Sequence, residues 1–311
     1  MIRRFDAKRG QSLKKLYFHV GSGRCGSTLI QALFNDKMFH GIFADHSRSY
    51  DPQIYISTGT IAHEDSFVED SWRPIREKFI APMANAASEG FFITQENLLG
   101  MRSDKDKKNI CEVSCEKVAY LSEGHEPHII IVIRRQDTYI ESLYNQRLKR
   151  WEKRDFETFV AEFPRDNWHW LENIDIYSNH FGRENVTVVP FEGKVYGDSG
   201  LTGFLDGVLK AMGVTTRFAF NDLPVMNASL APRVLEIQRI ANNQLNQNEA
   251  HALADWFGEN IAKKPDDPHK LMTDDIRREL IEFYRESNLA LCDKYFADFP
   301  NAKAYYTGED I

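Results

Sequence analysis

The stretch from residue 16 to residue 28 reads LYFHVGSGRCGST and predicts a buried β-strand, a glycine-rich turn and the start of an α-helix. The apolar run 16–20 has the length of a strand, and a helical pattern runs from Ser27 to about Phe34. Glycines let the backbone turn tightly and approach a ligand closely, and the N–H groups that open a helix attract anions. The stretch is therefore either an anion-binding turn or simply a tight connection between two elements.

This turn imitates a Walker A phosphate-binding loop but lacks its lysine. Gly21, Gly26 and Thr28 have the spacing of that motif, whereas Ser27 stands in the lysine position and the cation, Arg24, lies upstream. A nucleotide kinase also needs a carboxylate near its magnesium ion, commonly at a strand end. The strongest apolar run of the chain ends in two arginines instead, which argues against a kinase.

That run, residues 128–133 (HIIIVI), predicts a second strand, followed by a helix from Asp137 to about Arg150. Arg134 ends the strand, and Ser142 follows it by eight residues. If Asp137 caps the helix, Ser142 lies about 7.5 Å along the helix axis. Arg134 and Ser142 could then hold one phosphate, or they could form a solvated basic corner with a surface serine.

Short apolar strands alternate with helical stretches along most of the chain. Residues 91–94 (FFIT) and 186–189 (VTVV) complete four predicted strands, and such continuous apolar strands indicate a parallel sheet covered on both faces. We predict one α/β domain over residues 1–311: a three-layer α/β/α, P-loop-like core with a mainly parallel sheet at about 14–225, and a helical C-terminal part at about 226–299. Its helices are predicted at 229–245, 249–262 and 274–295, with a break around Asp266 and Pro268.

Composition excludes several classes of protein. The chain has 311 residues, 42% hydrophobic and 27% charged, and its net charge of −7 argues against nucleic acid or an anionic membrane as the main partner. No apolar run reaches the roughly 18–20 residues that span a bilayer, and the basic start leads into too short an apolar stretch for a secretory signal. Four cysteines without zinc-like spacing predict a reduced, cytoplasmic protein without a metal.

The two arginine-bearing segments together resemble the paired signatures of sulfotransferases that use 3′-phosphoadenosine 5′-phosphosulfate (PAPS). In that family a Lys or Arg, any residue, Gly and two hydroxyl residues hold the 5′-phosphosulfate, and residues 24–28 (RCGST) match position by position. An Arg at a strand end with a Ser eight residues later holds the 3′-phosphate, as Arg134 and Ser142 would. Stretches at 134–146, 181–186 and 227–230 further resemble uncharacterised bacterial members, so the resemblance covers about residues 16–245.

The resemblance implies a metal-independent transfer of a sulfuryl group from PAPS to an acceptor hydroxyl. The family's common Trp after the hydroxyl pair is replaced by Leu29, which is more like carbohydrate and protein sulfotransferases than those acting on small phenols. We therefore expect a carbohydrate or glycoconjugate acceptor, whose identity the sequence leaves open along with the oligomeric state. The residues expected to bind PAPS are Gly23, Arg24, Cys25, Gly26, Ser27, Thr28, Arg134 and Ser142.

Arg24 is also expected to act in catalysis, by stabilising the charge on the leaving phosphate, while a general base must take the acceptor's proton. Glu96, just after the predicted strand 91–94, resembles the acid that glycan-type members carry in a similar turn. It could instead cap the next segment or pair with an arginine. His40 and His46 are rival bases, whereas His19 inside the first strand is better explained as a core histidine.

Three alternatives remain at this stage. The charged stretch 102–108 (RSDKDKK) is most simply a solvated loop, though it could form a lid over the site. A P-loop kinase would need the missing loop lysine and strand-end acid. A non-catalytic nucleotide-binding protein would keep Arg24 but have no functional base.

Overall fold

A four-stranded parallel sheet forms the centre of the computed structural model, which describes residues 15–35, 67–84, 90–99, 110–214, 230–261 and 270–309. Neighbouring strands all run parallel, in the order β2-β1-β3-β4. Each of the four predicted strands is confirmed, with ends within two residues of the prediction. Their bounds are β1 (Lys15–Gly21), β2 (Gly90–Thr94), β3 (Glu126–Ile133) and β4 (Val186–Pro190).

Branched apolar residues account for the central strands. Residues 129–133 of β3 are all fully buried, as expected for a strand whose two faces are both covered. On β1, Leu16, Phe18 and Val20 are fully buried on one face, and His19 lies on the other. Leu16 pairs with Phe91 of β2 and with Pro127 of β3, so apolar residues of three strands lie level with one another.

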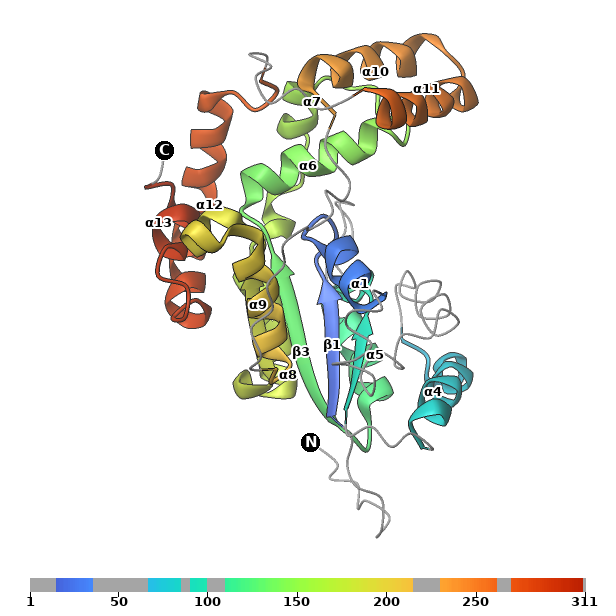
Figure 1. The fold of residues 1–311 in the computed structure, drawn as a ribbon, viewed down its shortest axis with the longest axis vertical. Helices are drawn as coiled ribbons and strands as arrows, with labels where there is room; N and C mark the ends of the chain where they lie inside the picture. The colour runs from blue at the N-terminus through green and yellow to red at the C-terminus, as the bar shows by residue number, and fades with distance from the viewer. Residues whose placement is uncertain are drawn as a thin grey trace.

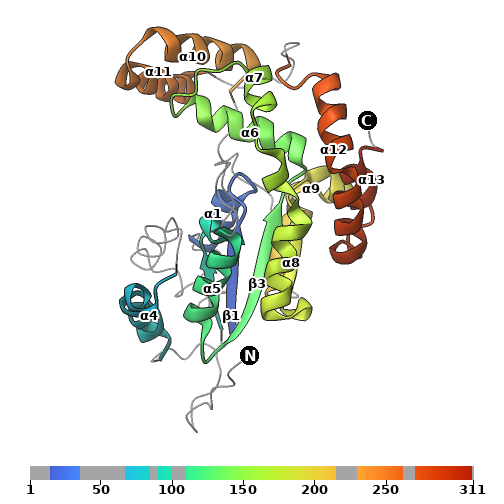
Figure 2. The same ribbon diagram turned by 180° about the vertical axis from the view of Figure 1, so that it is seen from behind.

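Helices cover both faces of the sheet. Figure 1 shows α1 (Ser27–Asn35) and α9 (Gly200–Ala211) on the near face, and Figure 2 shows α5 (Ile110–Ser122) and α8 (Trp170–Phe181) on the opposite one. A further helix, α4 (Glu69–Ala84), packs against α5. The predicted three-layer α/β/α arrangement is confirmed.

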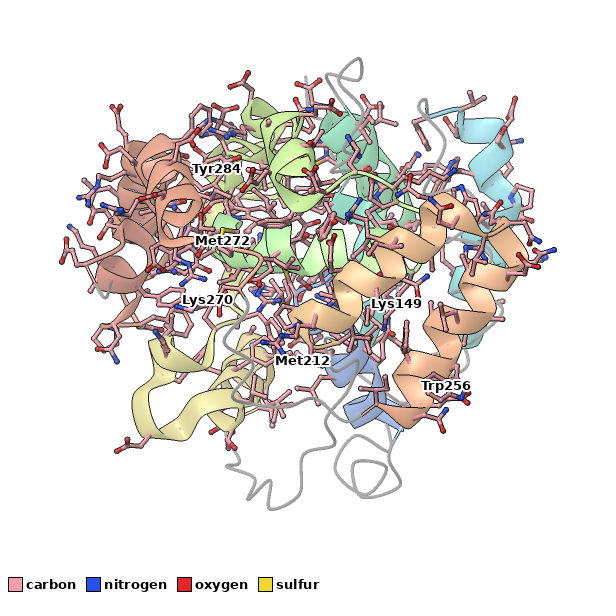
Figure 3. The ribbon with its side chains drawn as sticks, turned by 90° about the horizontal axis from the view of Figure 1, so that it is seen from above. Lys149, Met212, Trp256, Lys270, Met272 and Tyr284 are labelled. Atoms are coloured by element: carbon pink, nitrogen blue, oxygen red, sulfur yellow. The ribbon has the colours of Figure 1, made fainter. Side chains whose placement is uncertain are left out.

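Helices α6, α7, α10 and α11 lie beyond the carboxyl ends of the strands (Figure 1). Helix α6 crosses this edge of the sheet, α10 packs on α6 and α11, and α12 packs on α6, α8 and α13 (Figures 1 and 3). The predicted helices near 229–245 and 249–262 are found with shorter or shifted ends, and the one at 274–295 has its predicted bounds. The elements are α6 (Gln136–Leu148), α7 (Phe156–Ala161), α10 (Pro232–Gln244), α11 (Gln247–Asn260), α12 (Asp274–Tyr295) and α13 (Ala302–Thr307), with the 3₁₀ turns η2 (Glu96–Leu99), η3 (Arg165–Trp168), η4 (Arg183–Asn185) and η5 (Gly193–Ser199).

The start of α6 corrects one detail of the sequence analysis, because Asp137 does not cap the helix. Arg135 occupies the N-cap position without a side-chain cap bond, and Asp137 lies inside the first turn. The buried Asp137 carboxylate accepts hydrogen bonds from Arg135 at 2.7 and 3.1 Å and pairs with Arg277 of α12 at 3.2 Å. Asp137 therefore ties the β3–α6 turn to the C-terminal helices.

Several predictions fall on residues outside the described ranges. These are the rival bases His40 and His46, the charged stretch 102–108, the break at Asp266 and Pro268, and the boundary near residue 225 between core and C-terminal part. Within the described residues, no helix is both long and apolar enough to cross a membrane.

Candidate active site

The glycine-rich loop between β1 and α1 is fixed by neighbouring strands. The backbone N–H of Ser22 donates to the carbonyl oxygen of Val132 in β3 at 2.7 Å. Gly21 has a φ of +127°, and a Cβ at this position would collide with the carbonyl oxygen of Glu96. Gly26 has a φ of +83°, and a Cβ there would lie 2.6 Å from the Phe191 ring. Only glycine satisfies both positions, so the loop lies tightly between β3, η2 and the end of β4.

Arg24 and Ser142, which the sequence analysis assigned to two separate motifs, are in contact. The Nε of Arg24 donates to the hydroxyl of Ser142 at 3.3 Å, although 118 residues separate them. Burial, followed by the positive charge of Arg134, lowers the pKa of the Arg24 guanidinium. The structure therefore brings Arg24, Ser142 and Arg134 together at the carboxyl edge of the sheet.

Arg134 is held through its Nε and its backbone carbonyl oxygen. Its Nε donates to the hydroxyl of Thr138 at 3.2 Å and to the Glu192 carboxylate at 3.3 Å, and its carbonyl oxygen accepts from the Trp170 indole at 2.9 Å. The guanidinium also lies 5.8 Å from the centre of the Phe191 ring. Its two terminal nitrogens make no hydrogen bond to any described residue, so they are available to an anion.

The neighbouring Arg135 has a different role, because it is buried and fully engaged by the protein. Besides Asp137, it donates to the carbonyl oxygen of Tyr305 at 2.6 Å and stacks 4.1 Å from the centre of that ring. The two arginines that end the apolar run therefore have different roles: Arg134 contributes to the site, and Arg135 joins β3 to α13.

Glu96 lies directly beside the loop. It opens η2, just after Gln95, whose N–H donates to the carbonyl oxygen of His19 at 2.9 Å and so continues the β1–β2 pairing. A Cβ built on Gly23 would lie 3.7 Å from the carboxyl carbon of Glu96. The Glu96 carboxylate makes no hydrogen bond to another described residue, and its charge acts on Arg24. A basic oxygen therefore lies next to the loop.

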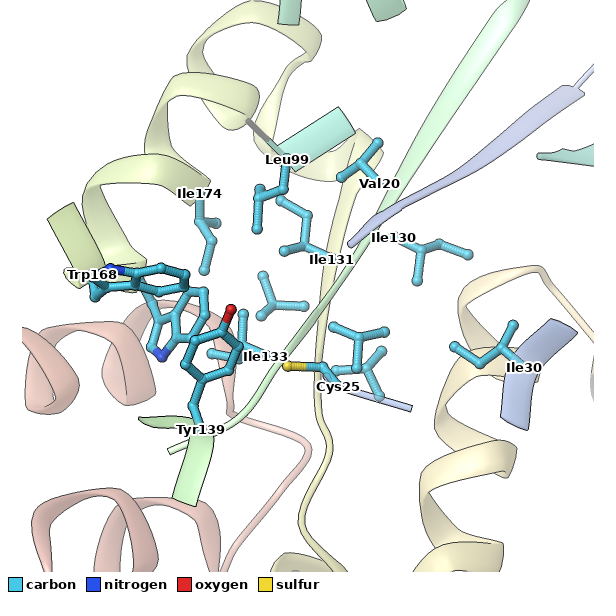
Figure 4. Close-up of a cluster of buried hydrophobic side chains, with 14 of the residues drawn as sticks. Val20, Cys25, Ile30, Leu99, Ile130, Ile131, Ile133, Tyr139, Trp168 and Ile174 are labelled. Carbon is cyan, nitrogen blue, oxygen red and sulfur yellow. The ribbon is translucent and has the colours of Figure 1, made fainter. Parts of the chain in front are cut away.

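The other loop residues divide into inward-facing and outward-facing positions. Cys25 is fully buried with its sulfur among apolar side chains that include Tyr139 and Ile133 (Figure 4), and burial raises its pKa to about 12. Ser27 is buried and its hydroxyl donates to the Ser22 carbonyl at 3.4 Å, whereas Thr28 is exposed. The Cys25 side chain is therefore a packing residue, and only its backbone N–H can serve an anion.

His19 is a core histidine, as the sequence analysis favoured. It is fully buried, its Nδ1 lies 2.8 Å from the Thr94 hydroxyl, and burial lowers its pKa to about 4. Its Nε2 has no hydrogen-bond partner among the described residues.

Glu192 and Thr138 are site residues that the sequence analysis missed. The only available signal was their position after strands of a parallel sheet, where side chains of different strands meet. Among the described residues there is no group of three or more His, Cys, Asp or Glu side chains that could hold a metal ion.

The fold and the site define an α/β protein in which two arginine-bearing segments meet at the carboxyl edge of a parallel sheet. No protein-family model and no curated protein matches the chain. Among solved structures, a sulfotransferase from Alicyclobacillus acidocaldarius is similar with a TM-score of 0.49 and 13% identity, over 92% of this chain and 98% of that one. The sulfotransferase domain from the Synechococcus PCC 7002 olefin synthase is similar with a TM-score of 0.39 and 13% identity, over 84% of this chain and 100% of that one.

Proposed function

We propose that this chain is a sulfotransferase that moves a sulfuryl group from PAPS to an acceptor hydroxyl without a metal. The observation that carries the proposal is the contact between Arg24 and Ser142. It joins the loop motif that resembles a 5′-phosphosulfate site to the helix motif that resembles a 3′-phosphate site. A donor with two phosphate groups needs both motifs in one cleft.

The residues fit such a donor in both number and charge. Arg24 and Arg134 both keep terminal nitrogens that are unpaired within the described part of the chain, and a guanidinium edge matches a phosphate group bidentately. The loop amides and the start of α1 would hold the 5′ end, because the first N–H groups of a helix have no acceptor within it. Arg134 and the Ser142 hydroxyl would hold the 3′-phosphate.

The chemistry follows from what these side chains can do. PAPS would supply the sulfuryl group and leave as 3′-phosphoadenosine 5′-phosphate (PAP). Arg24 and the loop N–H donors stabilise the negative charge that develops on the leaving phosphate oxygen, which is the work of preorganised donors in group transfer. Glu96 accepts the proton of the acceptor hydroxyl, because its carboxylate lies against the loop and has no competing hydrogen bond among the described residues.

A carbohydrate or glycoconjugate is the acceptor class we propose. It rests on Leu29, which stands where small-molecule members of the family carry a Trp. Leu29 is buried in α1, so no aromatic platform comes from this position.

Calorimetry with PAP and with Mg-ATP tests the donor, and turnover with radiolabelled PAPS on a panel of polysaccharides and phenols tests the acceptor. We expect PAP to bind more tightly than ATP, label to enter a polysaccharide, and EDTA to leave turnover unchanged. Equal affinity for ATP, or a loss of activity with EDTA that Mg²⁺ restores, would instead support a kinase. PAP binding without any transfer across the panel would favour a non-catalytic nucleotide-binding protein.

A further inference from the structure

Glu192 is a second acid, besides Glu96, at a site that also holds Arg24 and Arg134. It lies two residues beyond the end of β4, and only 12% of its side chain is exposed. Phe191 donates its N–H to the carbonyl oxygen of Ile133 at 2.7 Å, which prolongs the β3–β4 pairing and places Glu192 one residue beyond the level of Arg134. Its location is therefore fixed by the sheet and not by a free loop.

The contacts of Glu192 all lead to Arg134 or to its neighbours. One carboxylate oxygen, Oε1, accepts two hydrogen bonds. The first comes from the Thr138 hydroxyl at 2.6 Å, and the second comes from the Arg134 Nε at 3.3 Å. Thr138 in turn accepts from the same Nε at 3.2 Å, so the three groups close a small ring. Tyr305 of α13 also interacts with the carboxylate, and burial together with Glu192 raises the pKa of the Tyr305 phenol.

This ring engages only one edge of the guanidinium. An arginine has five N–H donors in a rigid planar fork, so fixing its Nε sets the direction of its terminal nitrogens. Those nitrogens remain unpaired within the described part of the chain, whereas a carboxylate that competed with a ligand would occupy them. Glu192 also offsets the repulsion between Arg134 and Arg24, which are close enough for Arg134 to lower the Arg24 pKa.

We infer that Glu192, together with Thr138, is a positioning residue that holds Arg134 ready for the 3′-phosphate of the donor. The inference rests on the proposed function and deepens it, since it assigns the 3′-phosphate preference to an acid just beyond β4 that touches no ligand. Glu192 gives the protein a preference for nucleotides with a 3′-phosphate, because it orders the Arg134 side chain before binding. Less side-chain freedom is then lost when the ligand arrives.

Calorimetric binding of PAP and of adenosine 5′-phosphate, which lacks only the 3′-phosphate, tests the inference. Glu192→Ala should weaken PAP binding about tenfold or more, the worth of a charged hydrogen bond, and leave adenosine 5′-phosphate unchanged. Glu192→Gln keeps an oxygen for Thr138 and should recover part of the loss. Thr138→Val should lose less PAP affinity than Glu192→Ala. In an Arg134→Ala background, Glu192→Ala should not weaken PAP binding any further.

Glu184→Ala is the matched control, because it removes the same charge from η4 at the opposite end of β4. It should leave both affinities at their wild-type values. Equal weakening of both nucleotides by Glu192→Ala, or tighter PAP binding, would overturn the positioning role: Glu192 would be structural in the first case and a competing anion in the second. If the wild-type protein itself does not prefer PAP over adenosine 5′-phosphate, the proposed function fails instead.

Discussion

Arg24 donates a hydrogen bond to Ser142 at 3.3 Å across 118 residues of sequence, and the order of the strands explains why the two meet. β1 leads into α1 and on to β2 on one side, while β3 leads through α6 and α8 to β4 on the other. β1 and β3 are neighbours whose connections leave in opposite directions, and in open α/β sheets ligands bind at such a point, outside the carboxyl ends of the strands. Arg24 follows β1 and Ser142 follows β3, so both lie at this edge of the sheet.

The 3′-phosphate assignment predicts selective losses of affinity. Arg134→Ala should cost about 1.5–3 kcal/mol of PAP binding and Ser142→Ala about 1 kcal/mol, because Arg134 offers a charged guanidinium and Ser142 a single uncharged hydroxyl donor. Both losses should vanish with adenosine 5′-phosphate, as calorimetry can measure. Arg150→Ala, an exposed charge just beyond the same helix, is the control. Equal losses with both nucleotides would mean that Arg134 and Ser142 are structural.

Removing the basicity of Glu96 should slow transfer without releasing the donor. Glu96→Gln keeps the shape of the side chain beside Gly23 but cannot take a proton, so turnover should fall about 10²–10⁴-fold while PAP affinity is kept. The measurement is initial rate with radiolabelled PAPS alongside calorimetry. If Glu96→Gln is fully active and His40→Ala or His46→Ala abolishes turnover with PAP binding intact, that histidine is the base.

Gly26 should be far more sensitive to substitution than another glycine with a similar φ. Gly26 and Gly124 have φ values of +83° and +79°, but a Cβ at Gly124 meets nothing within 4 Å. Gly124→Ala should cost about 1–2 kcal/mol from the backbone alone. Gly26→Ala should cost more, because its Cβ would press on Phe191, and it should also weaken PAP binding. Urea unfolding measures the loss in free energy of unfolding for each variant. Equal losses for Gly26→Ala and Gly124→Ala would show that the Phe191 ring moves aside easily.

Burial of His19 predicts a pH-dependent stability. Its folded pKa of about 4 lies below the usual value of 6.5, so the unfolded chain binds the extra proton between these values. Stability from this group is complete above pH 6.5 and falls as the pH drops toward 4, by up to about 3 kcal/mol. His19→Asn keeps a donor for Thr94 but does not titrate. Urea unfolding at pH 7 and pH 5 should therefore show a smaller difference for this variant than for the wild type, and equal differences would contradict the prediction.

Local sequence determined the elements and the motifs that they carry. The apolar runs of β1 to β4 fixed the strands because a strand buried on both faces must be apolar at nearly every position. The glycines and hydroxyls of the loop, and the eight-residue spacing from Arg134 to Ser142, are likewise properties of short stretches. The resemblance to sulfotransferases rests on these stretches, so it was visible without a structure.

Only the tertiary structure decided which side chains meet at the carboxyl edge of the sheet. Arg134 and Arg135 are adjacent and chemically identical, and they differ because Asp137 and Tyr305 bury Arg135 while the terminal edge of Arg134 stays unpaired among the described residues. Glu192 reaches Arg134 through the pairing of β3 with β4, across 58 residues. Burial and charge pairing act between segments that are distant in sequence, and therefore no local pattern of residues contains them.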